Sequence, residues 1–169
     1  MRKIVLVVHD VLCCHNVGSL LRTADGIGVE AVYLTGYTPC PQDTKDQRLP
    51  HVAKKIDNAI RKTALGAEKT VNWHHFKNVK SLLERLATRG YMITALEQTA
   101  TALPLQNHQS ITPLVLVIGN EVNGLPEDLL SLIPSHLSIP MLGKKESYNV
   151  VQATAMALFQ LRFHSRPLE

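Results

Sequence analysis

Short apolar runs alternate along the chain with segments whose apolar residues recur every three or four positions. The runs are rich in β-branched and aliphatic side chains, which indicates strands buried on both faces. They comprise residues 3–8, 31–34, 91–96, 114–118 and 137–139. Helical spacing is found in residues 16–28, 51–64, 79–90, 125–132 and 149–163. The alternation predicts an α/β fold with a single, mostly parallel sheet of about five or six strands, flanked by helices.

Local signals set the expected ends of these elements. Asn16 is predicted to cap the first helix, Gly90 to end the third, and Pro126 to open the fourth. Residues 73–75 are expected to form a turn at the surface or at an edge. Residues 99–112 show no periodicity and are predicted to be irregular.

Composition places the chain among soluble globular proteins. The 169 residues fit one domain, and 45% apolar against 19% charged residues suffice for a packed core. Three cysteines, Cys13, Cys14 and Cys40, are an odd set that favours a reduced cytoplasmic compartment. No stretch resembles a signal peptide or approaches the ~20 apolar residues of a membrane span. We therefore expect a cytoplasmic protein with no membrane contact.

Several common kinds of site are disfavoured. The sequence has no GxGxxG after the first strand and no GxxxxGK[ST], which argues against dinucleotide binding and against an NTPase. Cys13, Cys14 and His15 are adjacent and lack the spacing of zinc ligands, so no metal is expected. No Ser, His and acid set stands in a recognisable nucleophile context.

Ligands of parallel sheets bind beyond the carboxyl ends of the strands, and polar residues gather after several predicted strands. After the first strand come Asn16, Gly18 and Arg22. The planar, permanently charged Arg suits a phosphate or an oxygen that gains negative charge. An ordinary helix cap and a solvated Arg are the alternative reading. After residues 114–118, Glu121 stands between Gly119 and Gly124, where a polar ligand group is expected to bind and Gly119 to let it approach the backbone.

A third constellation follows residues 137–139. Ile139, Met141 and Leu142 offer apolar side chains and free backbone groups around a flat ring, because Pro140 interrupts strand pairing. Ser147 and Asn149 precede the last helix, where each side chain caps the helix or reaches a ligand.

Together the three segments resemble the three motifs of the SpoU (TrmH-like) branch of the SPOUT RNA methyltransferases. The matching positions of the first motif are Asn16, Gly18, Arg22 and Ala24. Those of the second are Gly119, Glu121, Gly124, Leu125 and Pro126. Those of the third are Ile139, Pro140, Met141, Glu146, Ser147, Asn149 and Val150. Residues 62–68 are also similar to the family, so the likeness spans nearly the whole chain.

The resemblance implies a SPOUT domain over residues 1–169, with a C-terminal deep trefoil knot and no separate RNA-binding domain. It also implies a homodimer that binds S-adenosylmethionine and methylates a ribose 2′-hydroxyl of tRNA or rRNA, with tRNA slightly preferred. A catalytically inactive RNA-binding module and a small-molecule enzyme are the alternatives. The residues implied to bind the cofactor are Leu96, Gly119, Ile139, Met141, Leu142, Ser147 and Asn149. Those implied near the chemistry are Arg22, Asn16, Glu121, Ser147 and Asn149.

Roles for two of these residues follow from their chemistry. The reference pKa of Arg lies above 12, so Arg22 is expected to orient the RNA and stabilise a developing alkoxide rather than take its proton. The family view that this Arg itself accepts the proton stays open. Glu121 is expected to hold either Arg22 or a neighbouring backbone group in place.

The net charge of +4 is confined to one segment. Six basic and two acidic residues lie between Lys45 and Lys62, and the rest of the chain holds equal numbers of each sign. This segment is a candidate surface for RNA phosphates, with a solvated helix face as the alternative. The residues expected to contact RNA are Arg22, Lys54, Lys55, Arg61 and Lys62.

Overall fold

The computed structural model describes residues 3–44, 46–109 and 113–163. Its strands are β1 (Ile4–His9), β2 (Ala31–Thr35), β3 (Trp73–Phe76), β4 (Met92–Leu96), β5 (Leu103–Pro104), β6 (Leu114–Ile118) and β7 (Ser135–Ser138). Its helices are α1 (Cys14–Ile27), α2 (Pro50–Ala64), α3 (Ala67–Thr70), α4 (Val79–Ala87), the 3₁₀ helix η1 (Leu105–Asn107), α5 (Glu127–Leu130) and α6 (Val150–Phe163).

The described strands form a single sheet in the order β3-β2-β1-β6-β4-β7-β5, and every neighbouring pair is parallel. The predicted α/β class is confirmed, but five or six strands was too few. Trp73, His74 and His75 belong to β3 rather than to a turn, because their backbone pairs with β2. The two-residue β5 lies in the segment predicted to be irregular, where two positions are too few to produce a pattern. The trefoil knot that the resemblance implies stays a prediction.

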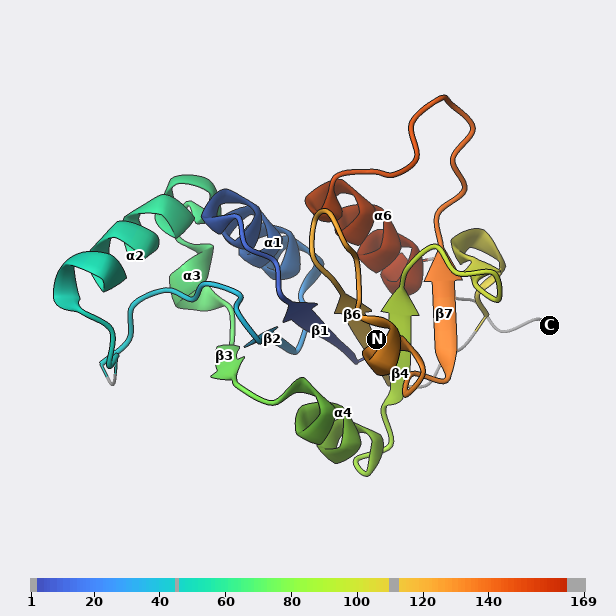
Figure 1. Cartoon of the computed structure of the whole chain (residues 1–169), viewed down its shortest axis with the longest axis horizontal. Coiled ribbons are helices and arrows are strands. Elements are labelled where there is room, and N and C mark those ends of the chain that lie inside the picture. Colours follow the sequence, from blue (N-terminus) through green and yellow to red (C-terminus); the bar gives the residue numbers. More distant parts are fainter. Residues whose placement is uncertain (1–2, 45, 110–112, 164–169) are drawn as a thin grey trace.

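The central strands are covered on both faces, which explains their unbroken apolar runs. Along β1, Ile4, Leu6 and Val8 pack in a cluster with side chains of α1, α2 and α6. Val5 and Val7 point the other way and pack with side chains of α4 and α5. Figure 1 shows this arrangement, with α1 and α6 on one face of the sheet and α4 on the other. Because strand side chains alternate between faces, a strand covered on both sides needs apolar residues at every position.

Gly18 holds α1 close to α2. A Cβ at this position would lie 2.2 Å from the Ile60 carbonyl oxygen and 2.3 Å from Thr63 Oγ1. Only glycine therefore allows the two helices to approach this closely, and the Thr63 hydroxyl donates to the His15 carbonyl at 2.7 Å across the same contact. Gly18 thus has a packing role, which positions the basic helix α2 against the helix that carries Asn16 and Arg22.

The predicted N-cap of α1, Asn16, was wrong by three residues. The helix begins at Cys14, its N-cap is Cys13, and no side chain caps it locally. Asn16 lies inside the first turn, where its side chain is free to bond to another part of the chain. The predicted helix over residues 125–132 is also shorter, since only Glu127–Leu130 is helical. The other predicted helices agree with α2, α4 and α6 to within a few residues.

Candidate active site

The carboxylate of Glu121 joins the segment after β6 to the N-terminal end of α1. Its Oε2 accepts a hydrogen bond from the Leu12 N–H at 3.1 Å, and its Oε1 accepts from the Cys13 N–H at 3.0 Å. The Asn16 side chain donates to the same Oε1 at 2.9 Å. A distant carboxylate thus accepts from backbone N–H groups at the start of α1, where a local cap is missing and the helix dipole favours negative charge. We call this arrangement the Glu121 clamp.

The clamp keeps Glu121 ionised. Partial burial alone would raise the pKa of its carboxyl group, but the hydrogen bonds from Asn16, Leu12 and Cys13 outweigh burial and lower the pKa. Hydrogen bonds donated to a carboxylate favour its charged form. Glu121 is therefore a fixed acceptor at neutral pH and has no proton to donate.

Two glycines allow the segment that carries Glu121 to fold back on itself. The N–H groups of Asn120 and Gly124 each donate to the other residue's carbonyl, at 3.1 and 3.0 Å. A Cβ on Gly119 would lie 2.4 Å from the Gly124 carbonyl carbon, and Gly124 has a φ of +66°. Gly119 was expected to let a ligand approach the backbone. Gly119 lines the cleft at the ends of the strands, so its predicted ligand contact stays a prediction. In addition, a neighbouring part of the same loop fills the space where its side chain would lie.

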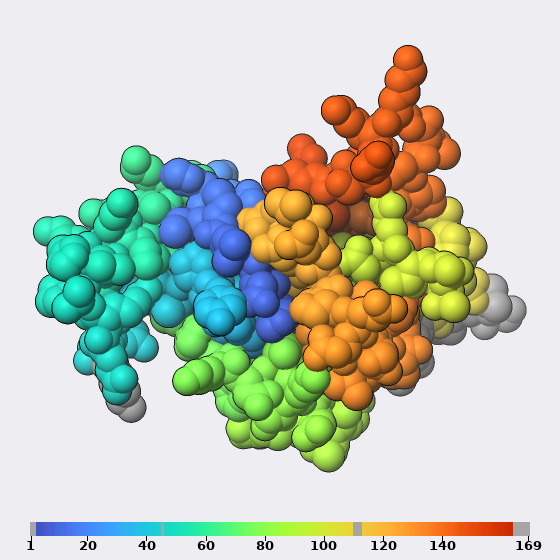
Figure 2. Space-filling model, viewed as in Figure 1, coloured from blue at the N-terminus to red at the C-terminus, as the bar shows by residue number. Residues whose placement is uncertain are grey.

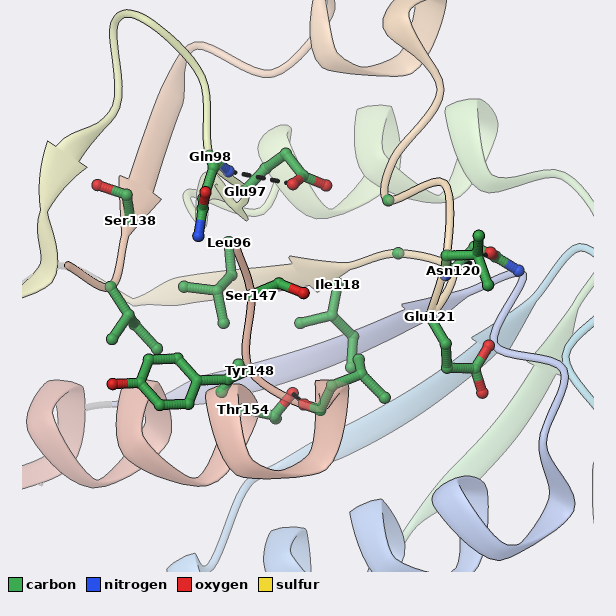
Figure 3. Close-up of a pocket in the computed structure, with 16 residues that line it drawn as sticks. Leu96, Glu97, Gln98, Ile118, Asn120, Glu121, Ser138, Ser147, Tyr148 and Thr154 are labelled. Atoms are coloured by element: carbon green, nitrogen blue, oxygen red, sulfur yellow. Dashed lines mark hydrogen bonds between the residues drawn. The ribbon is translucent and has the colours of Figure 1, made fainter. Parts of the chain in front are cut away.

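A cleft opens beyond the carboxyl ends of β4, β6 and β7, next to the clamp (Figure 3). Its apolar lining comes from the ends of these strands and the start of α6, and its polar lining from the connecting segments. The apolar residues include Leu96, Ile118, Ile139 and Val150, and the polar ones include Glu97, Gln98, Glu121, Ser147 and Thr154. A second, more open hollow is lined by Leu12, Cys13 and Asn16 and shares Asn120, Glu121 and Val122 with the cleft. Glu121 therefore stands between two adjoining hollows.

Among the lining residues not named individually from the sequence are Glu97 and Gln98, which directly follow Leu96, in the segment implied to hold the cofactor. Glu97 accepts from the Gln98 N–H at 3.0 Å and from the Leu125 N–H at 2.9 Å. It therefore holds the C-terminal end of the segment that carries Glu121 and its two flanking glycines. The Gln98 side chain donates to the Glu146 carbonyl at 3.0 Å and holds the segment before α6. Both residues directly follow β4. The rule that ligands bind beyond the carboxyl ends of parallel strands could have identified them as candidate site residues.

Arg22 lies on α1 with an exposed side chain. In the described part of the chain it forms no ion pair. Of the two contacts expected of Glu121, with Arg22 or with neighbouring backbone, the structure has the second. The guanidinium is thus available to a ligand from solution.

Comparison with known proteins matches residues 3–159 to the model of the SpoU rRNA Methylase family. The chain belongs to this family. It is 24% identical over 161 residues to a tRNA (guanosine(18)-2'-O)-methyltransferase of Borreliella burgdorferi, covering 95% of this chain and 66% of the relative. It is 31% identical over 168 residues to a 23S rRNA (guanosine-2'-O-)-methyltransferase of Pseudomonas aeruginosa, covering 98% of this chain and 61% of the relative. The chain thus spans less than two thirds of the length of either one.

The SpoU fold is also found among solved structures. An AdoMet-bound rRNA methyltransferase from Sinorhizobium meliloti superposes with a TM-score of 0.79 at 23% identity, over 96% of this chain and 56% of that chain. At this identity the match establishes the shared fold. The resemblance found in the three sequence motifs is therefore confirmed at the level of family and fold.

The third SpoU motif lies partly in the cleft. Its residues Ile139, Ser147 and Val150 line the cleft, whereas Met141, Asn149 and the neighbouring Leu142 do not. Leu142 is 98% exposed, and Asn149 Oδ1 accepts from the Val151 N–H at 2.9 Å at the start of α6. Figure 2 shows the segment between β7 and α6 projecting from the molecule. The predicted cofactor contacts of these three residues stay predictions.

The basic surface of this SpoU chain is smaller than its sequence suggested. Arg61 Nε lies 2.7 Å from Asp57 Oδ2 and 3.9 Å from Glu68 Oε1, and both carboxylates are buried. These ion pairs partly neutralise the Arg61 guanidinium, whose side chain is still 49% exposed, and its predicted contact with RNA stays a prediction. Arg48 is likewise paired, with Asp46. The exposed cations that remain on α2 are Lys54, Lys55 and Lys62, and Lys45 lies outside the described residues.

Within residues 3–44, 46–109 and 113–163, no cluster of three or more His, Cys, Asp or Glu side chains is suited to hold a metal ion. None of the helices in the same ranges is long and apolar enough to cross a membrane.

Proposed function

We propose that the chain is an S-adenosylmethionine-dependent methyltransferase that acts on a ribose 2′-hydroxyl of RNA. The observation that carries the proposal is the junction at Glu121, where residues of two family motifs are bonded together between two adjoining hollows. One hollow suits the methyl donor and the other the RNA nucleotide. The match to the SpoU family over residues 3–159 supports this assignment. As part of this proposal, we expect the protein to act in the cytoplasm.

The cleft fits the chemistry of the proposed cofactor. Leu96, Ile118 and Ile139 offer apolar surface to a flat adenine ring, while Glu97 and Ser147 offer polar groups to the ribose and to the amino acid end. When bound, S-adenosylmethionine supplies a methyl group on a positively charged sulfur. The protein then has only to align the acceptor oxygen and promote the loss of its proton.

The residues of the first motif are placed to act on the acceptor. Arg22 is a permanent cation with no ion-pair partner among the described residues, and we assign it to orient the RNA and stabilise the developing alkoxide. Asn16 and Glu121 fix the start of the helix that carries Arg22. In this proposal Glu121 acts through positioning, because its carboxylate is already occupied by three N–H donors.

Relatives named as acting on tRNA and on 23S rRNA both match the chain, and we retain tRNA as the slightly preferred substrate. The test is incubation with cofactor labelled in its methyl group and with bulk tRNA or ribosomal RNA, followed by nuclease digestion and nucleoside analysis. Label on a ribose supports the proposal, and label on a base contradicts it. Retention of RNA without any transfer would favour an inactive RNA-binding module.

The lysines of α2 are the expected phosphate contacts. Replacing Lys54→Glu and Lys55→Glu together should weaken RNA binding and reduce the slope of log affinity against log salt by about 2, since each lost phosphate contact contributes about 0.9. Binding titrations at several salt concentrations measure this slope, and calorimetry should show unchanged cofactor affinity.

A matched control changes the same amount of charge on the opposite face of the sheet. Lys77→Glu with Arg89→Glu alters exposed cations on either side of α4, which packs on the face away from α2. This double variant should leave the salt slope nearly unchanged. Equal effects of the two double variants would show that net charge, rather than α2, attracts RNA.

We also propose that the protein forms a homodimer through α6. Met156, Phe159 and Phe163 are 37%, 51% and 51% exposed, and the two phenylalanine rings lie 5.0 Å apart. Adjacent exposed aromatic side chains on a helix are suited to pack against another copy of the chain. Sedimentation at micromolar concentration should give the mass of a dimer. A monomer mass at that concentration would refute this part of the proposal.

A further inference from the structure

The turn after β2 is held rigidly against the end of β1. The Tyr37 N–H donates to Asp10 Oδ1 at 2.7 Å, and the Thr38 hydroxyl donates to the Val8 carbonyl at 3.2 Å. Gly36 has a φ of +65°, and a Cβ on it would lie 2.1 Å from Asp10 Oδ1. Residues 35–38, which we call the Tyr37 turn, are therefore pinned to β1 by backbone and side-chain contacts.

Among the side chains of this turn, that of Tyr37 points into solvent. It is 85% exposed, whereas Thr35 and Thr38 on either side of it are buried. A tyrosine on a fixed backbone loses little conformational freedom when it binds a partner, because only two side-chain torsions remain to be ordered. The turn thus presents a preorganised aromatic ring to solvent.

The same contacts connect this ring to the candidate active site. Asp10, which receives the Tyr37 N–H, accepts through its own carbonyl from Asn120 Nδ2 at 2.8 Å. Asn120 immediately precedes Glu121 of the clamp. Since β2, β1 and β6 are parallel neighbours, their carboxyl ends meet at one edge of the sheet. Tyr37 is therefore held at the edge that carries both hollows.

Charge indicates what kind of partner approaches this edge. The chain runs from the Tyr37 turn into α2, which carries the exposed cations Lys54, Lys55 and Lys62 and lies at one end of the molecule in Figures 1 and 2. The loop between them is tied to the helix, because the Gln42 N–H donates to Asp57 Oδ1 at 3.0 Å. A partner that spans both features offers negative charge to α2 and a flat ring to Tyr37. Nucleic acid has both.

We propose that Tyr37 is a stacking platform for a base of the RNA substrate, next to the nucleotide that is methylated. This inference rests on the proposed function and adds a binding residue that none of the three family motifs contains. Stacking of a base on an aromatic side chain tolerates any base, so Tyr37 contributes affinity and position rather than sequence choice.

The experiment compares binding of fluorescein-labelled bulk tRNA by the wild type and by Tyr37→Ala, Tyr37→Leu, Tyr37→Phe and Tyr37→Trp, with unlabelled ribosomal RNA as competitor. Loss of one stacked base should weaken binding by Tyr37→Ala and Tyr37→Leu about 5- to 150-fold. Tyr37→Phe and Tyr37→Trp should bind like the wild type. The factor should be the same at every salt concentration, unlike that of the lysine variants. Calorimetry should show unchanged affinity for S-adenosylmethionine.

Several results would overturn the inference. Wild-type affinity in Tyr37→Ala removes the ring from the RNA interface, and loss of binding in Tyr37→Phe assigns the effect to the hydroxyl instead of the ring. A shift of Tyr37→Ala from dimer to monomer in sedimentation places the ring between two copies of the chain. If the wild type methylates RNA and Tyr37→Ala binds equally well, only this inference fails. If the wild type neither binds nor methylates RNA, the proposed function fails with it.

Discussion

Replacing Arg22→Ala should lower the rate of methyl transfer by about 100- to 1,000-fold, which is the usual cost of removing one donor to a developing oxyanion. Arg22 is exposed on α1, so the variant should fold normally. Calorimetry should show unchanged affinity for S-adenosylmethionine, because Arg22 does not line the cleft. Single-turnover assays with saturating RNA and labelled cofactor measure the rate.

Two further variants define the role of Arg22. Arg22→Lys keeps the charge but loses the planar fork of donors, so it should recover only part of the rate. Arg89→Ala removes another exposed arginine from the face of the sheet opposite α1 and should be neutral. If Arg22→Ala weakens cofactor binding as much as it slows transfer, Arg22 belongs to the cofactor site. Normal turnover in Arg22→Ala would remove it from the mechanism.

Replacing Glu121→Ala should reduce both stability and activity, because it removes the acceptor of three N–H groups from α1 and the segment before it. The free energy of unfolding should fall by about 1–3 kcal/mol, the cost of leaving partly buried donors without partners. Transfer should fall by about 100-fold, since a displacement of about 1 Å at a reacting centre has an effect of this size. Urea unfolding and single-turnover assays measure the two effects, and Glu127→Ala on α5 is the matched control.

The stability effect of Glu121 should depend on pH in a defined direction. Its carboxyl pKa is lowered in the folded protein from the ordinary value of 4.5, so the carboxylate stabilises the fold fully above pH 4.5. This contribution is lost as pH falls through the lower folded value. The difference in unfolding free energy between the wild type and Glu121→Ala should therefore shrink when pH is reduced below 4.5. A difference that stays constant or grows in acid would show that the clamp does not depend on ionised Glu121.

The sequence predicted those parts of the fold that depend on local pattern. Residues 114–118 are apolar at every position, and they form the fully buried strand β6 at the centre of the sheet. The apolar spacing of Val79, Leu82 and Leu86 likewise predicted α4. The edge strand β3 was missed because an edge position requires little burial, so His74 and His75 are exposed and form no apolar pattern.

For the site, the sequence located the segments but not their contacts. Glu121, Ser147 and Ile139 were named from motif and position, and all three line the cleft. No local sequence pattern predicted that the Tyr37 turn is held in a fixed position, because the Asp10 carboxylate that holds it is 27 residues away. Arg61 pairs most closely with Asp57, four residues earlier on the same helix, a spacing that the sequence contains. Only its longer contact with buried Glu68 requires the packed helices.

The sequence by itself thus determined the α/β class, most helices and central strands, and the residue types gathered after strand ends, since these depend on local spacing and burial. Only the tertiary structure decided which of those residues meet. Glu121 lies 105 residues from Asn16 and bonds to it because β1 and β6 are parallel neighbours in the sheet. The order of strands is set by packing across the whole domain, and no local pattern contains it.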